Sequence, residues 1–368
     1  MSAASGASDG RVVVAMSGGV DSSVAAALLQ AQGYEVVGIS LKLWPKALCD
    51  TVPKDRVCCS ARDIEDARLV AERLAIPFYV LDASQEFQHH VIDYFVSAYA
   101  AGETPNPCVA CNRSVKFGYL WRQAQGLGAA WLATGHYAKV VRDPARGRYA
   151  VQEASDPQKD QSYALFQLTQ QQLSHALMPL GDLEKPRVRA MAQALGLCVA
   201  EKPDSQEICF VPAGGYREFL RPRATGGLEP GPILTQDGRV VGAHQGIASY
   251  TVGQRRGLGI AAPRPLYVVA LEPERNAVIV GEAEALLQQT CRCRDATWMG
   301  IEALTEPWRV GVKIRYHHPK APAWIHPTAD GQVEVVFDEP QLAVTPGQAA
   351  VFYDGSTVIG GGWICPRP

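Results

Sequence analysis

The stretch "RVVVAMSGGVDSSVAAALL", residues 11–29, decides the fold class. Its valine-rich opening, residues 11–16, predicts a buried strand. The glycines at 18 and 19 permit a tight turn, and a helical pattern follows that ends at Gly33. A strand, a glycine turn and a helix in immediate succession predict the first βα unit of a parallel sheet.

The same alternation continues over the first ~200 residues. Strands are predicted at 35–44, 78–84 and 131–137, and a helix at 61–76 stops before Pro77. These elements predict an α/β domain with a parallel sheet over residues 1–212.

The rest of the chain has a different texture. Residues 213–282 are rich in glycine and proline, and "PILTQDGRVVG" predicts a hairpin that turns at Asp237-Gly238. Residues 283–368 alternate apolar and polar side chains, with a second turn at Asp354-Gly355. We therefore expect a small mainly-β central domain and a C-terminal β-barrel.

The composition of the 368 residues is that of a globular protein, with 47% hydrophobic and 20% charged residues. No apolar run is long enough to span a bilayer, and the first residues lack the apolar core of a signal peptide. A cytoplasmic protein with reduced thiols is expected, so the cysteines should be unpaired, catalytic or metal-bound. A formal net charge of −2 argues against a broadly basic nucleic-acid binder but allows local basic patches.

The glycine turn is a candidate anion site. Backbone N–H groups at a helix N-terminus attract phosphate, and Ser17, Ser22 and Ser23 add hydroxyl donors. The chain has neither the G-x-x-x-x-G-K-[ST] nor the G-x-G-x-x-G pattern at this turn, which disfavours a Walker A loop and a dinucleotide fold. The alternative is an ordinary βα turn capped by a serine or aspartate.

Three of the ten cysteines are candidate reactive groups. "TPNPCVACN" places Cys108 and Cys111 on a loop, as a redox couple, half of a metal site or a sulfur-handling site. Cys209 lies between a turn and a short strand, where a thiolate would be accessible. Cys198, in an apolar context, is predicted to be core. Cys291 and Cys293, in a strand-like stretch, are interpreted as structural. The three cysteines within residues 49–60 are interpreted as too irregularly spaced for a metal cluster.

"SGGVDSS" resembles the pyrophosphate loop, or PP-loop, of the N-type ATP pyrophosphatases. That resemblance implies cleavage of ATP between its α and β phosphates, with Asp21 as the partner of a magnesium ion. Seven motifs in order make the whole chain similar to the tRNA-specific 2-thiouridylase family. They are "SGGVDSS", "TPNPCVACN", "ATGHYA", "KDQSY", "DSQEICF", "GQRRGLGI" and "TPGQAAVFY".

The family resemblance implies a function. It is the ATP-dependent replacement of the C2 oxygen of the wobble uridine by sulfur, in tRNAs for lysine, glutamate and glutamine. The sulfur would arrive as a persulfide from a cysteine desulfurase, directly or through carriers, and a monomer is the simplest expectation. Residues 1–212 would form the adenylating and sulfur-transferring domain, and residues 213–282 and 283–368 would contact tRNA.

The resemblance also implies site residues. Cys209 would receive the persulfide, and Cys111 would be the second catalytic cysteine, which releases sulfur by forming a disulfide with Cys209. The positions expected to bind ATP are Ala15, Met16, Ser17, Gly18, Gly19, Val20, Asp21, Ser22, Leu41 and Gly135. The positions expected to contact tRNA are Asn106 and Pro107 at the target base, with His136, Lys159, Asp160, Gln161, Arg315, Tyr316 and Gln348. Arg255 and Arg256, on a glycine-rich turn, would meet phosphates.

Cys108 departs from the family pattern, because many members carry an aspartate that is proposed to act as a base there. A thiol is a poorer base at neutral pH than a hydrogen-bonded carboxylate. Cys108, Cys111 and Cys209 together are also what a [4Fe–4S] cluster with one open iron would require. The alternative is a normal two-cysteine mechanism beside a tolerated substitution.

Two other functions compete with this interpretation. Synthetases that use the same loop to activate an acceptor for an amine have no need of paired loop cysteines. An RNA-binding or sulfur-carrier module without catalysis would not need the intact loop with Ser17, Asp21 and Ser22. The basic strand at 312–318, with Lys313 and Arg315, could equally be a solvated face as an RNA contact.

Overall fold

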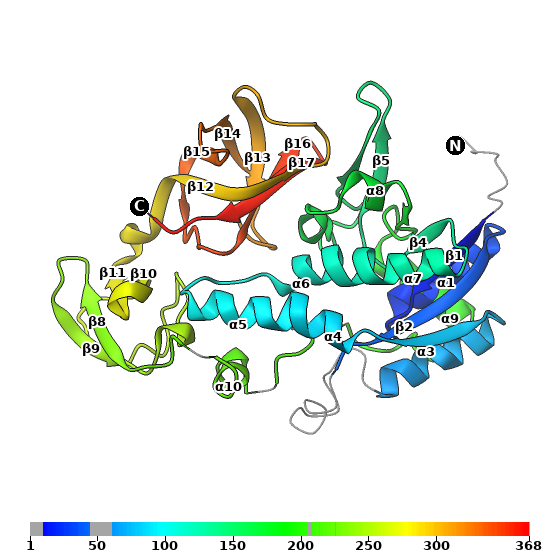
Figure 1. The fold of residues 1–368 in the computed structure, drawn as a ribbon, viewed down its shortest axis with the longest axis horizontal. Coiled ribbons are helices and arrows are strands. Elements are labelled where there is room, and N and C mark those ends of the chain that lie inside the picture. Colours follow the sequence, from blue (N-terminus) through cyan, green and yellow to red (C-terminus); the bar gives the residue numbers. More distant parts are fainter. Residues whose placement is uncertain (1–9, 45–60, 205–207, 213, 225, 368) are drawn as a thin grey trace. The chain divides into compact units, whose positions relative to one another are not determined.

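The computed structural model describes residues 10–44, 61–204, 208–212, 214–224 and 226–367 (Figure 1). The chain divides into two compact units, residues 1–90 with 108–213, and residues 91–107 with 214–368. The division falls near the expected boundary at 212, but it places residues 91–107 in the C-terminal unit. The three-domain boundaries stay a prediction.

The N-terminal unit contains a parallel sheet of five described strands in the order β3-β2-β1-β4-β7. Every neighbouring pair is parallel, as the βα alternation predicted. The strands are β1 (Arg11–Ala15), β2 (Glu35–Lys42), β3 (Phe78–Asp82), β4 (Trp131–Ala133) and β7 (Ala176–Leu177). The predicted strand at 131–137 ends at Ala133, because Gly135 turns the chain against the first turn of the first helix.

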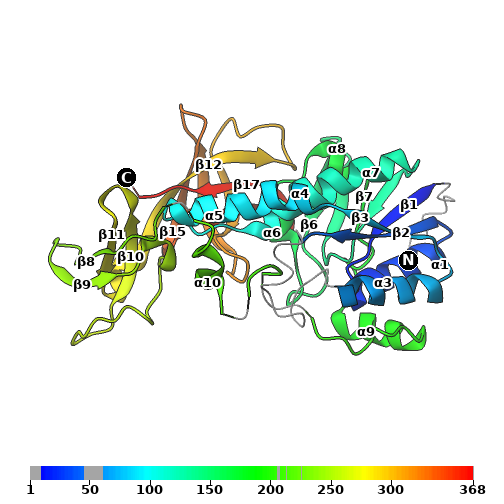
Figure 2. The ribbon, with the colours of Figure 1, turned by 60° about the horizontal axis from the view of Figure 1, so that its bottom comes forward.

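Helices cover both faces of this sheet. Apolar side chains of α1, α3 and α9 form one buried cluster with β1 and β2, and Figure 2 shows these helices on one face and α7 on the other. The helices of this unit are α1 (Val20–Ala31), α3 (Ala61–Arg73), α4 (Ser84–Phe87), α6 (Pro107–Ala110, beginning in the other unit), α7 (Trp121–Gly126), α8 (Gln170–Leu173) and α9 (Lys185–Ala194). Its described residues also form a π-helix, η2 (Cys111–Leu120), a 3-10 turn, η3 (Ser162–Leu165), and a hairpin of β5 (Lys139–Asp143) and β6 (Arg148–Gln152).

The C-terminal unit contains an antiparallel barrel, as predicted. Its strands follow the order β12-β15-β14-β13-β16-β17, and the pairing of β12 with β17 closes it. Their bounds are β12 (Leu287–Trp298), β13 (Trp308–Lys313), β14 (Ala321–Pro327), β15 (Val333–Leu342), β16 (Ala349–Asp354) and β17 (Thr357–Ile364). Cys291 and Cys293 are buried in the barrel core, which confirms their structural interpretation.

A second sheet of the C-terminal unit has the order β10-β11-β8-β9 among the described strands. The predicted hairpin at Asp237-Gly238 is confirmed, with Gly238 at a φ of +84°. The strands are β8 (Gly231–Thr235), β9 (Val240–His244), β10 (Tyr267–Glu272) and β11 (Ala277–Gly281). The helical elements are η1 (Gln88–Ile92, beginning in the other unit), α5 (Asp93–Ala100), α10 (Tyr216–Leu220), η4 (Ile247–Ser249), η5 (Pro273–Arg275) and η6 (Ala283–Leu286).

Within the described part of the chain, no helix is both long and apolar enough to cross a membrane.

Candidate active site

The glycine turn lies between the end of β1 and the start of α1, as the sequence predicted. Gly19 is the N-cap residue of α1. Gly18 has a φ of +70°, and a Cβ atom there would lie 2.0 Å from the main-chain oxygen of Asp63. Only glycine therefore fits at position 18, both for its backbone angle and for the space beside it.

Serine hydroxyls organise this turn from inside. The Ser22 hydroxyl oxygen accepts from the Ser17 N–H at 3.2 Å and donates to the Gly19 carbonyl at 3.2 Å. The Ser23 hydroxyl donates to the same carbonyl at 2.8 Å. These bonds hold the turn against the first turn of α1, where backbone N–H groups and the helix dipole favour an anion.

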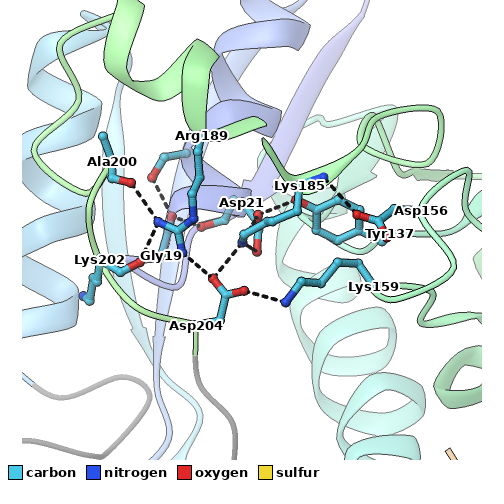
Figure 3. Close-up of polar contacts among 12 residues, drawn as sticks. Gly19, Asp21, Tyr137, Asp156, Lys159, Lys185, Arg189, Ala200, Lys202 and Asp204 are labelled. Atoms are coloured by element: carbon cyan, nitrogen blue, oxygen red, sulfur yellow. Dashed lines mark hydrogen bonds and ion pairs between the residues drawn. The ribbon is translucent and has the colours of Figure 1, made fainter. Parts of the chain in front are cut away.

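Asp21, the expected magnesium partner, is held by two groups from later in the chain (Figure 3). The ammonium of Lys185, at the start of α9, lies 2.7 Å from Asp21 Oδ1 and 2.8 Å from Oδ2. The Tyr137 hydroxyl donates to Oδ1 at 2.8 Å. Burial, followed by the charge of Asp21, raises the pKa of Tyr137, so this phenol stays protonated as a donor. The Lys185 side chain is 9% exposed, so its charge is largely shielded from water.

Asp204 is a second carboxylate in the same network. It pairs with Lys185 at 2.8 Å, with Lys159 at 2.8 Å and with Arg189 at 3.0 Å. Burial alone would raise the pKa of Asp204, but hydrogen bonds from Lys159 and Lys185 hold it below its ordinary value. Lys185 is therefore shared between two carboxylates, Asp21 and Asp204.

Lys202 ties the glycine turn to α3. Its ammonium donates to the Gly18 carbonyl at 2.8 Å and to Asp63 Oδ1 at 2.6 Å, and it also contacts Asp66. Burial opposes the charge, but the hydrogen bonds from the ammonium to Asp63 and Asp66 raise the Lys202 pKa above its ordinary value. The turn is thus fixed by a cation on one side and by glycine packing on the other.

Sequence reasoning did not find Lys185, Arg189, Lys202 or Asp204 as site residues. They lie more than 160 residues after Asp21, and no fixed spacing links them to the glycine turn. The one available signal is that Asp204 is the first residue of the "DSQEICF" motif and that Lys202 lies two residues before it.

The remaining positions expected to bind ATP lie around the turn. Leu41 is buried in β2, and Met16 directly follows β1. A Cβ atom at Gly135 would lie 2.6 Å from the Ser22 nitrogen, so the main chain at Gly135 packs directly on the first turn of α1. Their contact with adenosine stays a prediction.

Four residues expected to contact tRNA make internal bonds in the N-terminal unit. His136 is 8% exposed, and its Nδ1 lies 2.7 Å from the Thr134 hydroxyl. Burial, followed by the charge of Lys116, lowers the pKa of His136 well below its ordinary value, so the ring is neutral. Lys159 pairs with Asp204, the Asp160 carboxylate accepts from the Ser162 hydroxyl at 2.9 Å, and the Gln161 side chain accepts from the Tyr137 N–H at 2.9 Å. An RNA contact at these positions stays a prediction.

The expected tRNA residues of the C-terminal unit differ in exposure. Arg255 and Arg256 are exposed, and Arg255 borders a cavity of about 650 Å³ that residues 257–266 also line. Arg315 is exposed and donates to the Leu342 carbonyl at 3.2 Å, while Tyr316 is half-buried. Gln348 donates to the Thr104 carbonyl at 2.9 Å.

The three candidate catalytic cysteines belong to the N-terminal unit and differ in burial. Cys108 lies in α6 and is exposed, Cys111 begins η2 and is buried, and Cys209 is half-buried. The prediction of a loop for Cys108 and Cys111 is therefore wrong, because the chain is already helical from Pro107 onward. Among the described residues, no three histidine, cysteine, aspartate or glutamate side chains are grouped so as to hold a metal ion. Cys49, Cys58 and Cys59 lie outside the described residues.

The interpretation of Cys198 as a core residue is wrong, because its side chain is exposed. Its neighbours Leu197 and Val199 are buried at 4% and 1% exposure, so they account for the apolar context. Burial of part of the thiol, followed by the charge of Asp66, raises the pKa of Cys198.

Comparison with known proteins identifies the family. The tRNA-specific 2-thiouridylase MnmA of Moorella thermoacetica is 52% identical over 354 residues, which are 96% of this chain and 98% of that protein. The chain belongs to the tRNA-specific 2-thiouridylase family. The enzyme of the same name from Magnetococcus marinus is 50% identical over 96% of this 2-thiouridylase chain and 98% of its own length.

Family models match three successive parts of this 2-thiouridylase. The tRNA methyl transferase HUP domain matches residues 10–213, the tRNA methyl transferase PRC-barrel domain matches 217–282, and the aminomethyltransferase beta-barrel domain matches 288–364. Among solved structures, the NMN synthetase of Francisella tularensis covers 54% of this chain and 67% of its own, with 18% identity and a TM-score of 0.32. A likeness this weak adds no argument.

Proposed function

We propose that this chain catalyses the ATP-dependent 2-thiolation of the wobble uridine in tRNAs for lysine, glutamate and glutamine. As a 2-thiouridylase it is a tRNA sulfurtransferase, with tRNA as its substrate and ATP bound through its PP-loop domain. The observation that carries the proposal is the glycine turn at the start of α1, with Lys185 between Asp21 and Asp204 beside it.

The first step activates the uridine. Its C2 oxygen attacks the α-phosphorus of ATP, the bond to the bridging oxygen of the β-phosphate breaks, and pyrophosphate leaves. Negative charge grows on the leaving group, where the N–H groups of the first turn of α1 and the Lys185 ammonium would stabilise it. Lys185 is placed to do so, because it is held beside the glycine turn by two carboxylates, Asp21 and Asp204.

The donors at the turn suit a magnesium ion. Asp21 offers a carboxylate, and hard oxygen ligands together with phosphate oxygens are what magnesium prefers. A bound magnesium would neutralise phosphate charge. Asp21 would hold the ion, and Lys185, which contacts Asp21 from the start of α9, would add a second positive charge beside the phosphates.

The second step brings sulfur. The terminal sulfur of a persulfide on Cys209 attacks C2, and AMP departs with the former C2 oxygen. The Cys111 thiolate then attacks the inner Cys209 sulfur, the S–S bond breaks, and 2-thiouridine leaves with its sulfur. The resulting Cys111–Cys209 disulfide needs a thiol reductant before the next turnover. Cys111 is buried at the start of η2, so this step needs that helical segment to move and expose the thiol.

The sulfur step has a direct test in Cys209→Ser. Thiolation should be lost while tRNA-dependent pyrophosphate release continues, because the adenylating groups are untouched. Cys198→Ser, which removes another thiol of the same unit, is the matched control and should keep both activities. Normal thiolation by Cys209→Ser would remove Cys209 from the proposal.

An iron–sulfur cluster on Cys108, Cys111 and Cys209 is the alternative form of the sulfur step. Because the described residues form no group of three metal-ligating side chains, we route no step through a cluster. Iron and acid-labile sulfide in protein purified without oxygen decide the matter. About four irons per chain, lost in Cys108→Ala together with thiolation, would favour the cluster. No iron, with a persulfide on Cys209, would favour the two-cysteine cycle.

We assign further parts of the chain on the same basis. Residues 213–282 and 283–368 would be tRNA-contacting domains beside the catalytic domain of residues 1–212, and the exposed Arg255 and Arg256 would bind phosphates. A cysteine desulfurase or a sulfur-relay carrier would load Cys209, and the enzyme would act as a monomer. The donor can be tested by incubating the enzyme with a purified cysteine desulfurase and cysteine and measuring persulfide on Cys209.

One experiment separates the proposal from its competitors. Labelled ATP is mixed with unthiolated tRNA, and pyrophosphate is measured with and without the RNA. The proposal predicts release that depends on tRNA. For an amine-activating synthetase, pyrophosphate release would not depend on tRNA. A binding module without catalysis would release no pyrophosphate.

A further inference from the structure

Residues 103–107 are fixed onto the barrel of their own unit. The Glu103 carboxylate accepts two hydrogen bonds from Arg294 of β12, at 2.9 and 2.8 Å. The Glu103 side chain is 15% exposed, so water screens this pair only weakly. A bidentate pair between a guanidinium and a carboxylate sets orientation as well as distance.

The main chain of the next residue is held on both sides. The Thr104 N–H donates to the Pro346 carbonyl at 2.8 Å, and the Gln348 amide donates to the Thr104 carbonyl at 2.9 Å. The approach is close, because a Cβ atom at Gly347 would lie 2.7 Å from the Glu103 Cβ and 2.9 Å from the Thr104 nitrogen. Glycine at 347, with a φ of +84°, is therefore required for the segment to lie against the barrel.

Tyr94 of α5 supports the other end of the segment. Its hydroxyl is hydrogen-bonded to the main chain of Asn106, and its ring lies 6.1 Å from that of Trp363 in β17. The segment therefore has contacts at Glu103, Thr104 and Asn106 in one unit. The next residue along the chain after Pro107 is Cys108.

We propose that Arg294 and Gln348 are positioning residues for the target uridine, because they fix on the barrel the segment that carries Asn106 and Pro107. This inference rests on the proposed function, in which those two residues meet the target base. It gives Gln348, an expected tRNA contact, a second role through its hydrogen bond to Thr104. The barrel would thereby fix the segment that is expected to meet the base.

The test compares Arg294→Ala and Gln348→Ala with Arg309→Ala in the complete enzyme. Arg309 also pairs with a carboxylate on the barrel, Asp338, but does not touch residues 103–107. The measurements are kcat and KM for tRNA, the Kd for tRNA, the melting temperature, and the fluorescence of an anticodon stem-loop with 2-aminopurine at the wobble position. That fluorescence rises when the base leaves its stack.

For Arg294→Ala we expect kcat for thiolation to fall about 100-fold, the loss that a misplacement of about 1 Å produces. The Kd for tRNA should stay within about threefold, because the phosphate-binding arginines are unchanged. The fluorescence rise should be lost, Gln348→Ala should show the same pattern more weakly, and Arg294→Lys should recover part of kcat. Arg309→Ala should match the wild type.

A different pattern would overturn the inference. Unchanged kcat and fluorescence in Arg294→Ala would do so, as would a loss of tRNA affinity that accounts for the whole defect. A fall in melting temperature that Arg294→Lys does not reverse, with equal loss in Arg309→Ala, would make the pair merely structural. If the wild type itself forms no 2-thiouridine, the proposed function fails instead.

Discussion

Each unit of this enzyme contains partly buried ion pairs, but the cations differ: lysines in the N-terminal unit and an arginine in the C-terminal unit. In the N-terminal unit, Lys185 is shared between Asp21 and Asp204, and Lys202 between Asp63 and Asp66. In the C-terminal unit, Arg294 makes a bidentate pair with Glu103. A lysine ammonium is a compact charge that can contact several acceptors at once, whereas a bidentate arginine fixes one geometry. The lysine pairs therefore suit the stabilisation of phosphate charge, and the Arg294–Glu103 pair suits holding a segment in one position.

Removal of the shared cation should have the largest effect. We expect Lys185→Met to lower the rate of tRNA-dependent pyrophosphate release about 100- to 1000-fold, because a preorganised charge at the leaving group is lost. Lys139→Met, which removes the pair with Asp182 in the same unit, is the control and should stay near the wild-type rate.

Folding must be checked for the Lys185 variant, since its loss leaves Asp21 and Asp204 without their common partner. Lys185→Arg keeps the charge and should fold. A folded Lys185→Met enzyme that releases pyrophosphate at the wild-type rate would break the comparison, because the network would then be only structural.

Gly18→Ala should be the most damaging change to stability. We expect the free energy of unfolding to fall by about 2–4 kcal/mol, because the new methyl group meets the Asp63 carbonyl and the backbone angle is strained. Gly33→Ala is the matched control, since Gly33 has a φ of +90° with nothing within 4 Å of the new Cβ atom. It should lose only the strain, about 1–2 kcal/mol. Equal losses in denaturant titrations would show that the contact with Asp63 does not matter.

Acid should loosen the lysine network through Asp204. The folded-state pKa of Asp204 lies below its ordinary value, so its stabilisation is present above about pH 3.9 and is lost as the pH falls through the lower folded-state value. Because the group is partly exposed, we expect a contribution of about 1 kcal/mol. Asp204→Asn should therefore be less stable than the wild type at pH 6, with the gap closing below about pH 4. The free energies of unfolding would be measured by denaturant titration at each pH. A difference between the two proteins that stays constant from pH 6 to below about pH 4 would exclude the carboxylate charge as its cause.

The smallest effect should come from an exposed pair. Arg309→Ala removes a contact to Asp338 in which both side chains are at least 36% exposed. We expect the free energy of unfolding to change by less than about 1 kcal/mol and thiolation to stay normal. A larger loss of stability, measured by thermal unfolding, would contradict this expectation. It would mean that burial does not set the strength of the arginine–carboxylate pairs on this barrel.

Local signals predicted much of this fold. The βα unit at residues 11–31 and the hairpins at Asp237-Gly238 and Asp354-Gly355 depend on neighbouring residues, and all three are present. The helices between Ser84 and Gly126 were not predicted, and they change type several times along the chain. Elements this short do not repeat apolar residues at helical spacing over enough turns for the sequence to predict a helix.

The candidate site was only half predictable for a related reason. The glycine turn is local, so its residues could be read directly from the chain. Lys185 and Asp204 approach Asp21 only through folding, because β1, α1 and α9 bring together segments far apart in sequence. Cys198 shows the converse error, where apolar neighbours suggested burial that the side chain itself does not have.

The most direct test of the central claim is the stoichiometry of one reaction. Purified enzyme, labelled ATP, a thiol reductant, a cysteine desulfurase with cysteine and unthiolated glutamate tRNA are mixed, and AMP and 2-thiouridine are measured together. The account predicts one AMP for each 2-thiouridine, and no thiolation when the wobble uridine is replaced by cytidine. Sulfur incorporated without AMP, or AMP formed equally without a wobble uridine, would contradict it.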